Sequence, residues 1–278
     1  MAVSIRAAQS GDLDAIAGFL ARRLNHPDGP ARYRRFFTYP WMPDRPNLGY
    51  LIEDAGRIHG FIGAIYGRRP MGVVCNINSW AVDESHRTAS LLMARQLLAQ
   101  KDMAFTCFSP SPRVVELLEF FKFSTWPTEK IVVPIGAIGS LRDELAIKVM
   151  DPARDARILD DHHRAIFEDH RGYELAHVCL ELGDRTAYAV LGRRGRGVRT
   201  FADVMYVSDP GLFIRVIGRV QLHVARVLRT PAIGIDRRWL ERMPRLALNY
   251  RKLRPLQYKG LELPQLDTLY SELVPICG

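Results

Sequence analysis

Hydrophobic and polar residues follow one another along the first half of the chain in a pattern that predicts strands and helices in turn. Apolar side chains at 13, 16, 17, 20 and 24 share one face of a helix, which Ser10 or Asp12 caps. Two apolar runs flank Asp54, Ala55 and Gly56, a triplet typical of a hairpin turn. Further strands are expected at 3–8, 72–82, 103–109 and 125–134, and further helices at 88–100 and 111–121.

The second half repeats this order in pattern more than in identity. Residues 145–167 resemble residues 3–24, since each stretch has a strand of basic and apolar residues followed by an Asp-bearing helix start. Later strands are expected at 186–194, 198–208, 231–236 and 266–275, and helices at 211–228 and 237–246. The repetition and the length of 278 residues predict two domains, 1–138 and 139–278.

Composition places the chain among packed proteins. Hydrophobic residues make up 47% and charged residues 25%, which are ordinary values. No apolar run is long enough to span a membrane, and the start of the chain lacks the pattern of a secretion signal, so a cytoplasmic protein is expected. The net charge is +9 and only six of the 39 basic residues are lysines, which suits a phosphate-rich cofactor or a nucleic acid without choosing between them.

Cysteine and histidine residues form no metal-binding motif. Cys75, Cys107, Cys179 and Cys277 lie far apart, so reduced and buried thiols are expected rather than a disulfide framework or a zinc site. The stretch 159–173 is rich in Asp and His, but one helical face carries only two of these residues, too few for a closed site. We therefore expect no metal.

The turn after residue 82 carries the most specific pattern in the chain. A strand ending at Val82 is followed by Arg87, Ser90 and Leu92 at the start of a helix. Backbone amides at such a helix start bind a pyrophosphate without needing any particular side chain. A polar turn that simply enters a helix capped by Thr88 or Ser90 explains the same residues, so the turn alone leaves both interpretations open.

This turn and the order of elements around it resemble the GCN5-related N-acetyltransferase (GNAT) family, whose turn reads Arg or Gln, two free positions, Gly, one free position, then Gly or Ala. Arg87 matches the first position, whereas Ser90 and Leu92 replace the family's small residues. Residues 109–123 align without gaps to the family segment Asn-x-Arg-Ala-x-x-x-Tyr-x-x-x-Gly-Phe, through Ser111, Arg113, Val114, Leu118, Lys122 and Phe123. The resemblance implies an α/β (α+β layered) architecture of tandem GNAT-like domains, each a mixed, mostly antiparallel sheet flanked by helices, with a degenerate second copy.

The resemblance also implies a site for acetyl-CoA or another acyl-CoA in domain 1–138. The residues assigned to the coenzyme are Val82, Arg87, Thr88, Ala89, Ser90, Leu91, Leu92, Ser111 and Arg113. The amides near Ala81 and Val82 would hold the thioester carbonyl. Leu118 stands where many family members have a tyrosine that protonates the leaving thiolate, so that role is empty or filled elsewhere. His86 is the candidate base, and a solvated turn residue is the alternative.

Acceptor-binding residues are expected on the aromatic stretch 33–41 and on the strand before the turn. They are Tyr33, Phe37, Tyr39, Trp41, Asn76, Asn78 and Ser79. Aromatic residues that only cover an open edge of the core explain the first four equally well.

The function expected from these features is acyl-CoA-dependent N-acyltransfer, in which an acceptor amine attacks the thioester directly. A small-molecule amine or an amino sugar is the expected acceptor. One alternative is a non-catalytic GNAT-fold binding or scaffold protein. Another is a Fem-like transferase that takes an aminoacyl group from tRNA, for which an arginine-rich surface would bind RNA in a salt-sensitive way. Nucleic acid is otherwise not expected, and the oligomeric state is not determined by the sequence.

Overall fold

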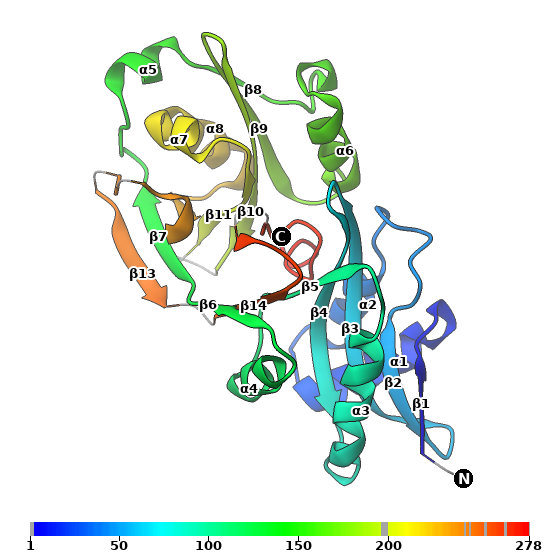
Figure 1. The fold of residues 1–278 in the computed structure, drawn as a ribbon. Coiled ribbons are helices and arrows are strands. Elements are labelled where there is room, and N and C mark those ends of the chain that lie inside the picture. Colours follow the sequence, from blue (N-terminus) through cyan, green and yellow to red (C-terminus); the bar gives the residue numbers. More distant parts are fainter. Residues whose placement is uncertain are drawn as a thin grey trace. The chain divides into compact units, whose positions relative to one another are not determined.

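A computed structural model describes residues 3–195, 200–241, 243–244, 246–252, 255–263 and 266–277. They form two compact units (Figure 1). The first comprises Met1–Trp126, Arg254–Leu266 and Tyr270–Ile276, and the second comprises Pro127–Leu253, Asp267–Leu269 and Cys277–Gly278. The division expected at 138/139 differs from these units, because the chain changes unit between Trp126 and Pro127 and later returns to the first unit.

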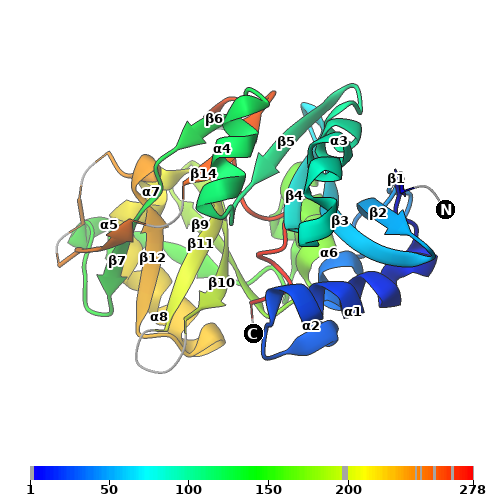
Figure 2. The same cartoon turned by 90° about the horizontal axis from the view of Figure 1, so that it is seen from below.

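The first unit has a seven-stranded sheet in the order β1-β2-β3-β4-β5-β14-β6 within the described residues. Its strands are β1 (Ser4–Ala7), β2 (Gly49–Asp54), β3 (Arg57–Arg69), β4 (Gly72–Val82), β5 (Met103–Cys107), β6 (Ser124–Trp126) and β14 (Leu256–Lys259). Its helices are α1 (Leu13–Leu24), α2 (Gly29–Phe37), α3 (Arg87–Leu98) and α4 (Pro112–Phe120), with 3-10 turns η1 (Ser10–Asp12) and η2 (Glu84–His86). Helices α1 and α2 cover one face of the sheet and α3 covers the other (Figure 2).

The second unit has a sheet of the same size, in the order β13-β7-β12-β11-β10-β9-β8 within the described residues. Its strands are β7 (Glu129–Pro134), β8 (Lys148–Met150), β9 (Leu175–Leu182), β10 (Arg185–Arg194), β11 (Phe201–Val207), β12 (Ala232–Asp236) and β13 (Leu248–Lys252). Its helices are α5 (Leu141–Ala146), α6 (Asp161–His170), α7 (Pro210–Arg215) and α8 (Ile217–Leu228), with 3-10 turns η3 (Ala156–Ile158) and η5 (Arg237–Trp239). The expected repetition of one supersecondary order is visible from β8 to β12.

Each sheet is mostly antiparallel with one parallel pair, which confirms the fold class expected from the sequence. The parallel pair is β4 with β5 in the first unit and β11 with β12 in the second. The change of unit after Trp126 follows from pairing, because β7 joins β12 and β13. Strand β14 lies between β5 and β6 and returns the chain to the first unit.

The hairpin predicted at Asp54, Ala55 and Gly56 is confirmed. Ala55 and Gly56 have φ angles of 49° and 75°, the left-handed conformation that a two-residue hairpin turn requires. The turn joins β2 to β3 in antiparallel register, with Asp54 opposite Arg57. The short connection brings the ends of β2 and β3 to the edge of the sheet where η2 begins.

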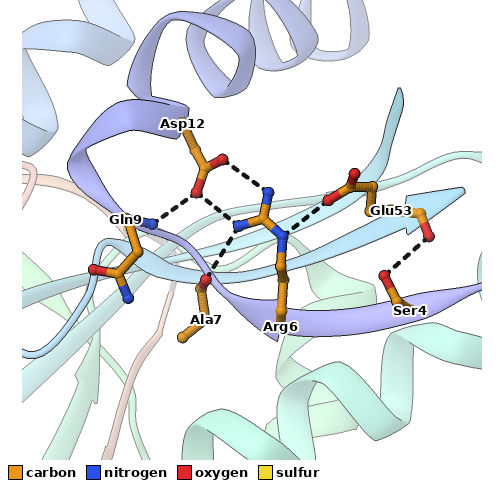
Figure 3. A network of polar contacts seen from close by, with 6 residues as sticks. All are labelled: Ser4, Arg6, Ala7, Gln9, Asp12 and Glu53. Carbon is orange, nitrogen blue, oxygen red and sulfur yellow. Dashed lines mark hydrogen bonds and ion pairs between the residues drawn. The ribbon is translucent and has the colours of Figure 1, made fainter. Parts of the chain in front are cut away.

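The start of α1 is organised by Arg6 rather than by a simple cap (Figure 3). Asp12 occupies the cap position, but its carboxylate accepts two hydrogen bonds from the Arg6 guanidinium at 2.8 Å and one from the Gln9 amide at 2.8 Å. Arg6 also donates to Glu53 on β2 at 2.8 Å. Hydrogen bonding from Arg6 lowers the pKa of Asp12. The network ties β1 to β2 and to the first turn of α1.

Several expected elements differ from the structure. Helix α2 spans residues 29–37 and includes the start of the aromatic stretch, where no helix was expected, and strand β9 was not predicted. The strand expected at 125–134 is two strands in different units, because Pro127 has no amide to continue the ladder. The helix expected at 211–228 is divided into α7 and α8 at Val216, whose φ is −121°.

The chain after residue 236 departs most from expectation. Only the 3-10 turn η5 occupies the described part of the helix expected at 237–246, in which 242 and 245 lie outside the described residues. No strand is present in residues 266–275, where a closing strand was expected. Strands β13 and β14 were not predicted. For the strand expected at 198–208, residues 198 and 199 lie outside the described part of the chain.

Candidate functional site

A pocket of about 280 Å³ lies in the first unit where the end of β4 meets the first turns of α3 and α4. Its polar lining consists of Arg87, Ser90, Ser111 and Arg113. Its apolar lining consists of Trp80, Val82, Leu91, Val114 and Leu117. The two segments singled out in the sequence therefore meet on one cavity, although β5 separates them along the chain.

Strand β4 reaches this pocket because it extends beyond the end of its pairing with β5. Its parallel pairing with β5 extends from Val73 to Asn76, and β4 continues to Val82. A bulge near Ser79, whose φ is 50°, shifts the register of β4 against β3. Beyond the bulge, Trp80 and Val82 both line the pocket.

Ser90 contacts the strand directly. The indole Nε1–H of Trp80 donates to Ser90 Oγ at 3.0 Å. Because an indole N–H is only a donor, the serine oxygen is the acceptor and its own hydrogen is directed elsewhere. Ser90 therefore retains a hydroxyl donor for a ligand in the pocket.

Two helices begin at the pocket. Helix α3 starts at Arg87, and α4 starts at Pro112 behind Ser111, whose Oγ accepts from the Val114 amide at 3.4 Å. The first amides of each helix carry partial positive charge, and Arg113 adds a full positive charge. This set of donors is suited to an anion such as a phosphate.

Arg87 is held loosely in this structure. Its Nη2 lies 3.1 Å from Glu84 Oε1, and both side chains are more than half exposed. Exposed ion pairs of this kind contribute about 0–1 kcal/mol, so a bound phosphate can compete with Glu84 for the guanidinium.

The other residues assigned to the coenzyme surround the pocket without lining it. Thr88 and Ala89 lie in the first turn of α3, where their contribution would be backbone amides. Leu92 replaces a family glycine or alanine, and its side chain is 55% exposed. Its bulk therefore points to solvent and does not narrow the cavity.

Residues expected to act in catalysis are placed as follows. Ala81 is buried and pairs with Phe61 of β3, while the Val82 carbonyl accepts from Arg23 Nη2 at 3.1 Å. His86 does not line the pocket, and its imidazole ring stacks on the ring of His59. Leu118 is fully buried in the core, so the position of the family tyrosine is a packing position here.

The aromatic residues expected to bind an acceptor are buried. Tyr33, Phe37, Tyr39 and Trp41 are each 8% exposed or less. Trp41 Nε1 donates to the Tyr66 carbonyl at 2.8 Å, and the Tyr66 amide donates to the Tyr39 hydroxyl at 3.0 Å. The structure thus places these rings in the core of the first unit, where they attach the segment around α2 to β3.

Asn76 and Asn78 are buried on β4. Asn76 Nδ2 donates to Thr106 Oγ1 at 3.2 Å, and Asn78 Nδ2 donates to the Asn76 carbonyl at 3.3 Å. The Oδ1 atom of each has no hydrogen-bond partner among the described residues. Buried acceptors are almost always satisfied in folded proteins, so these two oxygens mark a place for a donor from water or ligand.

Sequence reasoning missed three lining residues, Trp80, Val114 and Leu117. A signal for each was present. Trp80 shares a strand face with Val82 by the two-residue period, and Val114 and Leu117 follow Ser111 at helical spacing of three.

The described part of the chain holds no group of three or more His, Cys, Asp or Glu side chains arranged to bind a metal. All four cysteines are buried, and none of them forms a disulfide. Among the described helices, none has both the length and the apolar character needed to cross a bilayer.

No protein-family model and no curated protein sequence matches the chain, but solved structures do. A GCN5-related N-acetyltransferase from Anabaena variabilis superposes with a TM-score of 0.59 at 9% identity, covering 92% of this chain and 72% of that one. A GCN5-related N-acetyltransferase from Kribbella flavida gives 0.55 at 10% identity, covering 92% and 70%. The chain has the GNAT fold.

A third GNAT structure comes from a fungal multi-domain enzyme. It is a GCN5-related glucosamine N-acetyltransferase region of a GH3 β-N-acetylglucosaminidase, with a TM-score of 0.59 at 12% identity, covering 93% of this chain and 38% of that one. Each of the three similarities includes more than nine-tenths of this chain, and therefore parts of both compact units.

Proposed function

We propose that the protein is an acyl-CoA-dependent N-acyltransferase whose coenzyme site is the pocket at the ends of β4, α3 and α4. The observation that carries this proposal is the meeting of Arg87, Ser90, Ser111 and Arg113 on one cavity between two helix N-termini. Such a set of donors favours the binding of phosphate groups. The GNAT fold supports the same class of reaction, since its structural neighbours are acetyltransferases.

Different residues of the pocket would bind different parts of the coenzyme. The amides at the start of α3, with Ser90 and Arg87, would hold the pyrophosphate, and Arg113 at the start of α4 would hold a further anionic part of the coenzyme. The amides near Ala81 and Val82, at the end of β4, would donate to the thioester carbonyl oxygen and stabilise negative charge that develops there. When bound, the acyl-CoA supplies the activated acyl group.

The transfer itself needs few side chains. The acceptor nitrogen forms a bond to the acyl carbon, the carbon–sulfur bond breaks, and the amine proton ends on solvent or on the thiolate. Leu118 has no exchangeable proton, so this position supplies no acid. The protein's contribution is then mainly binding and orientation, which reduce the entropic barrier to attack.

An amine is the proposed acceptor, bound near Asn76 and Asn78. Their unpartnered Oδ1 atoms are acceptors, which suits the N–H donors of an amine. Among amines, an amino sugar is the narrower proposal, supported by the similarity to a glucosamine N-acetyltransferase region. Ser79, at the bulge, is proposed to contribute to the same site.

Only the first unit is proposed to bind the coenzyme. In the second unit, Asp209 occupies the turn before α7 and accepts from the Leu212 amide at 2.8 Å. Pro210 removes one amide donor there. A carboxylate at this helix start repels a phosphate, which supports a degenerate second copy. A cytoplasmic location, where acyl-CoA is available, belongs to the same proposal.

Calorimetric titration of the full chain with acetyl-CoA and CoA tests the proposal, beside Arg87→Glu and the control Arg35→Glu. Arg35 is an exposed arginine on α2 outside the pocket lining. Binding that Arg87→Glu loses and Arg35→Glu keeps supports the coenzyme site. If the wild type does not bind CoA at millimolar concentration, the proposal is wrong, and the scaffold and tRNA-dependent alternatives are next to be tested.

A further inference from the structure

Two histidines are stacked beneath the turn that leads into α3. His59 lies on β3 and His86 on η2, and their ring centroids are 4.2 Å apart with planes inclined by 17°. Both rings are partly buried, with side-chain exposures of 27% and 12%. The stack joins the turn to the first residues of β3, near the β2–β3 hairpin, over a separation of 27 residues in sequence.

Each stacked ring also contacts a carboxylate. His59 Nδ1 lies 3.0 Å from Asp83 Oδ2, and His86 Nε2 lies 3.4 Å from Asp54 Oδ2. The Asp83 amide donates to the His59 carbonyl at 2.7 Å, so side chain and backbone hold Asp83 against β3 together. Asp54 belongs to the β2–β3 hairpin, which adds a second strand to the contact.

A third element, helix α1, also contacts this turn. Arg23, near the end of α1, places Nε 3.2 Å from Asp83 Oδ1 and donates from Nη2 to the Val82 carbonyl at 3.1 Å. Its positive charge compensates the Asp83 carboxylate, which follows directly on a pocket-lining residue. An uncompensated carboxylate there would repel an anionic ligand.

These five residues, Arg23, Asp54, His59, Asp83 and His86, are called the histidine brace below. None of them lines the pocket. Val82 faces the cavity, whereas the next side chain, Asp83, is turned to Arg23 and His59. The brace therefore acts on the backbone of the turn and not on a ligand directly.

We propose that the histidine brace is a positioning device, which holds residues 83–90 in the shape that binds a pyrophosphate and keeps Asp83 from opposing it. The identity of the ligand rests on the proposed function, but the restraint on the turn does not. Amides that already point at their ligand lose little conformational entropy on binding, which is how such a restraint raises affinity.

The test combines hydrogen exchange of the ligand-free protein with CoA titration of the wild type, His59→Ala and His26→Ala. His26 is a matched control, because it also lies beside an aspartate, Asp28 at 3.5 Å, in the same unit but is not one of the five brace residues. In His59→Ala, we expect faster exchange at residues 83–90 and about tenfold weaker CoA binding. In His26→Ala, we expect neither change.

A second pair of variants separates the ring contact from general loss of structure. His86→Phe keeps an aromatic ring on His59 and loses two polar contacts, a long one to Asp54 at 3.4 Å and an exposed one to the neighbouring Ser85 at 2.8 Å. We expect CoA affinity within about twofold of the wild type for His86→Phe and about tenfold loss for His86→Ala. Equal loss in both variants would overturn the role given to the stack.

The outcomes also separate this inference from the proposed function. Unchanged exchange at residues 83–90 in His59→Ala contradicts the brace, whatever CoA does. Faster exchange in a protein whose wild type does not bind CoA supports the restraint on the turn and contradicts only the coenzyme site.

Discussion

The indole N–H of Trp80 donates to the hydroxyl oxygen of Ser90 across 3.0 Å, and so links the end of strand β4 to the first turn of helix α3. Both residues line the candidate pocket. The contact orients a serine hydroxyl that occupies a family glycine position, and it couples the wall of the cavity to the helix start. The residue at the glycine position of the family motif therefore lines the candidate pocket.

Removing the Trp80 donor should weaken coenzyme binding. We expect Trp80→Phe and Ser90→Ala each to raise the Kd for CoA by about threefold to tenfold, the range of one hydrogen bond of about 1 kcal/mol. The double variant should lose little more than Ser90→Ala alone, because Trp80 acts on the ligand through Ser90. Calorimetry measures all three, with Trp126→Phe as control. Fully additive losses would contradict the coupling.

Restoring the family tyrosine at position 118 should not restore an acid. Leu118 is fully buried, so Leu118→Tyr adds volume and a hydroxyl to a packed core. We expect a loss of about 1–3 kcal/mol in unfolding free energy. Thermal and urea unfolding measure this loss. A variant as stable as the wild type, with a gain in acyl transfer, would show that position 118 has access to the site.

The Arg6–Asp12 contact should make stability depend on acid pH. The pKa of Asp12 is lowered in the folded protein, so its contribution is complete above the ordinary aspartate pKa of about 3.9 and is lost as the pH falls through the folded value. We expect Asp12→Asn to lose about 1 kcal/mol or less at neutral pH and to approach the wild type in acid. Urea titrations between pH 2 and pH 7 test this, with Asp161→Asn, fully exposed, as control.

The second unit contains a buried ion pair, and we expect replacement of its acidic residue to lower the stability more than replacement of its basic residue. Lys130 on β7 contacts Asp203 on β11, and both are less than 10% exposed. Arg194 lies 3.7 Å from the other Asp203 oxygen. Asp203→Leu should cost about 3–5 kcal/mol because it leaves the buried Lys130 and the partly buried Arg194 without their carboxylate, whereas Lys130→Met leaves Arg194 for Asp203 and should cost less. Denaturant unfolding ranks the variants, and the reverse order would contradict this explanation.

The sequence predicted the first unit better than the second, and local chemistry explains why. The hairpin at Asp54, Ala55 and Gly56 forms because residues 55 and 56 adopt the left-handed backbone conformation of a tight turn, and β4 forms from a long apolar run. The pocket residues Arg87, Ser90, Ser111 and Arg113 were predicted through two motifs with a set spacing. Strands β13 and β14 have no comparable local signal, because they pair with strands far away in the sequence. Strand β9 is different, since it is an apolar run that pairs with the next strand, β10, across a tight turn at Gly183 and Asp184, and the sequence prediction missed it.

The sequence by itself determined the elements whose stabilising contacts are local, and with them the GNAT fold class and the two segments of the candidate site. Tertiary structure alone decided where the aromatic stretch lies, since burial of Tyr39 and Trp41 depends on Tyr66 of β3. It also decided that Leu92 faces solvent and that His86 packs on His59. These outcomes depend on contacts between residues far apart along the chain, which a one-dimensional pattern does not encode.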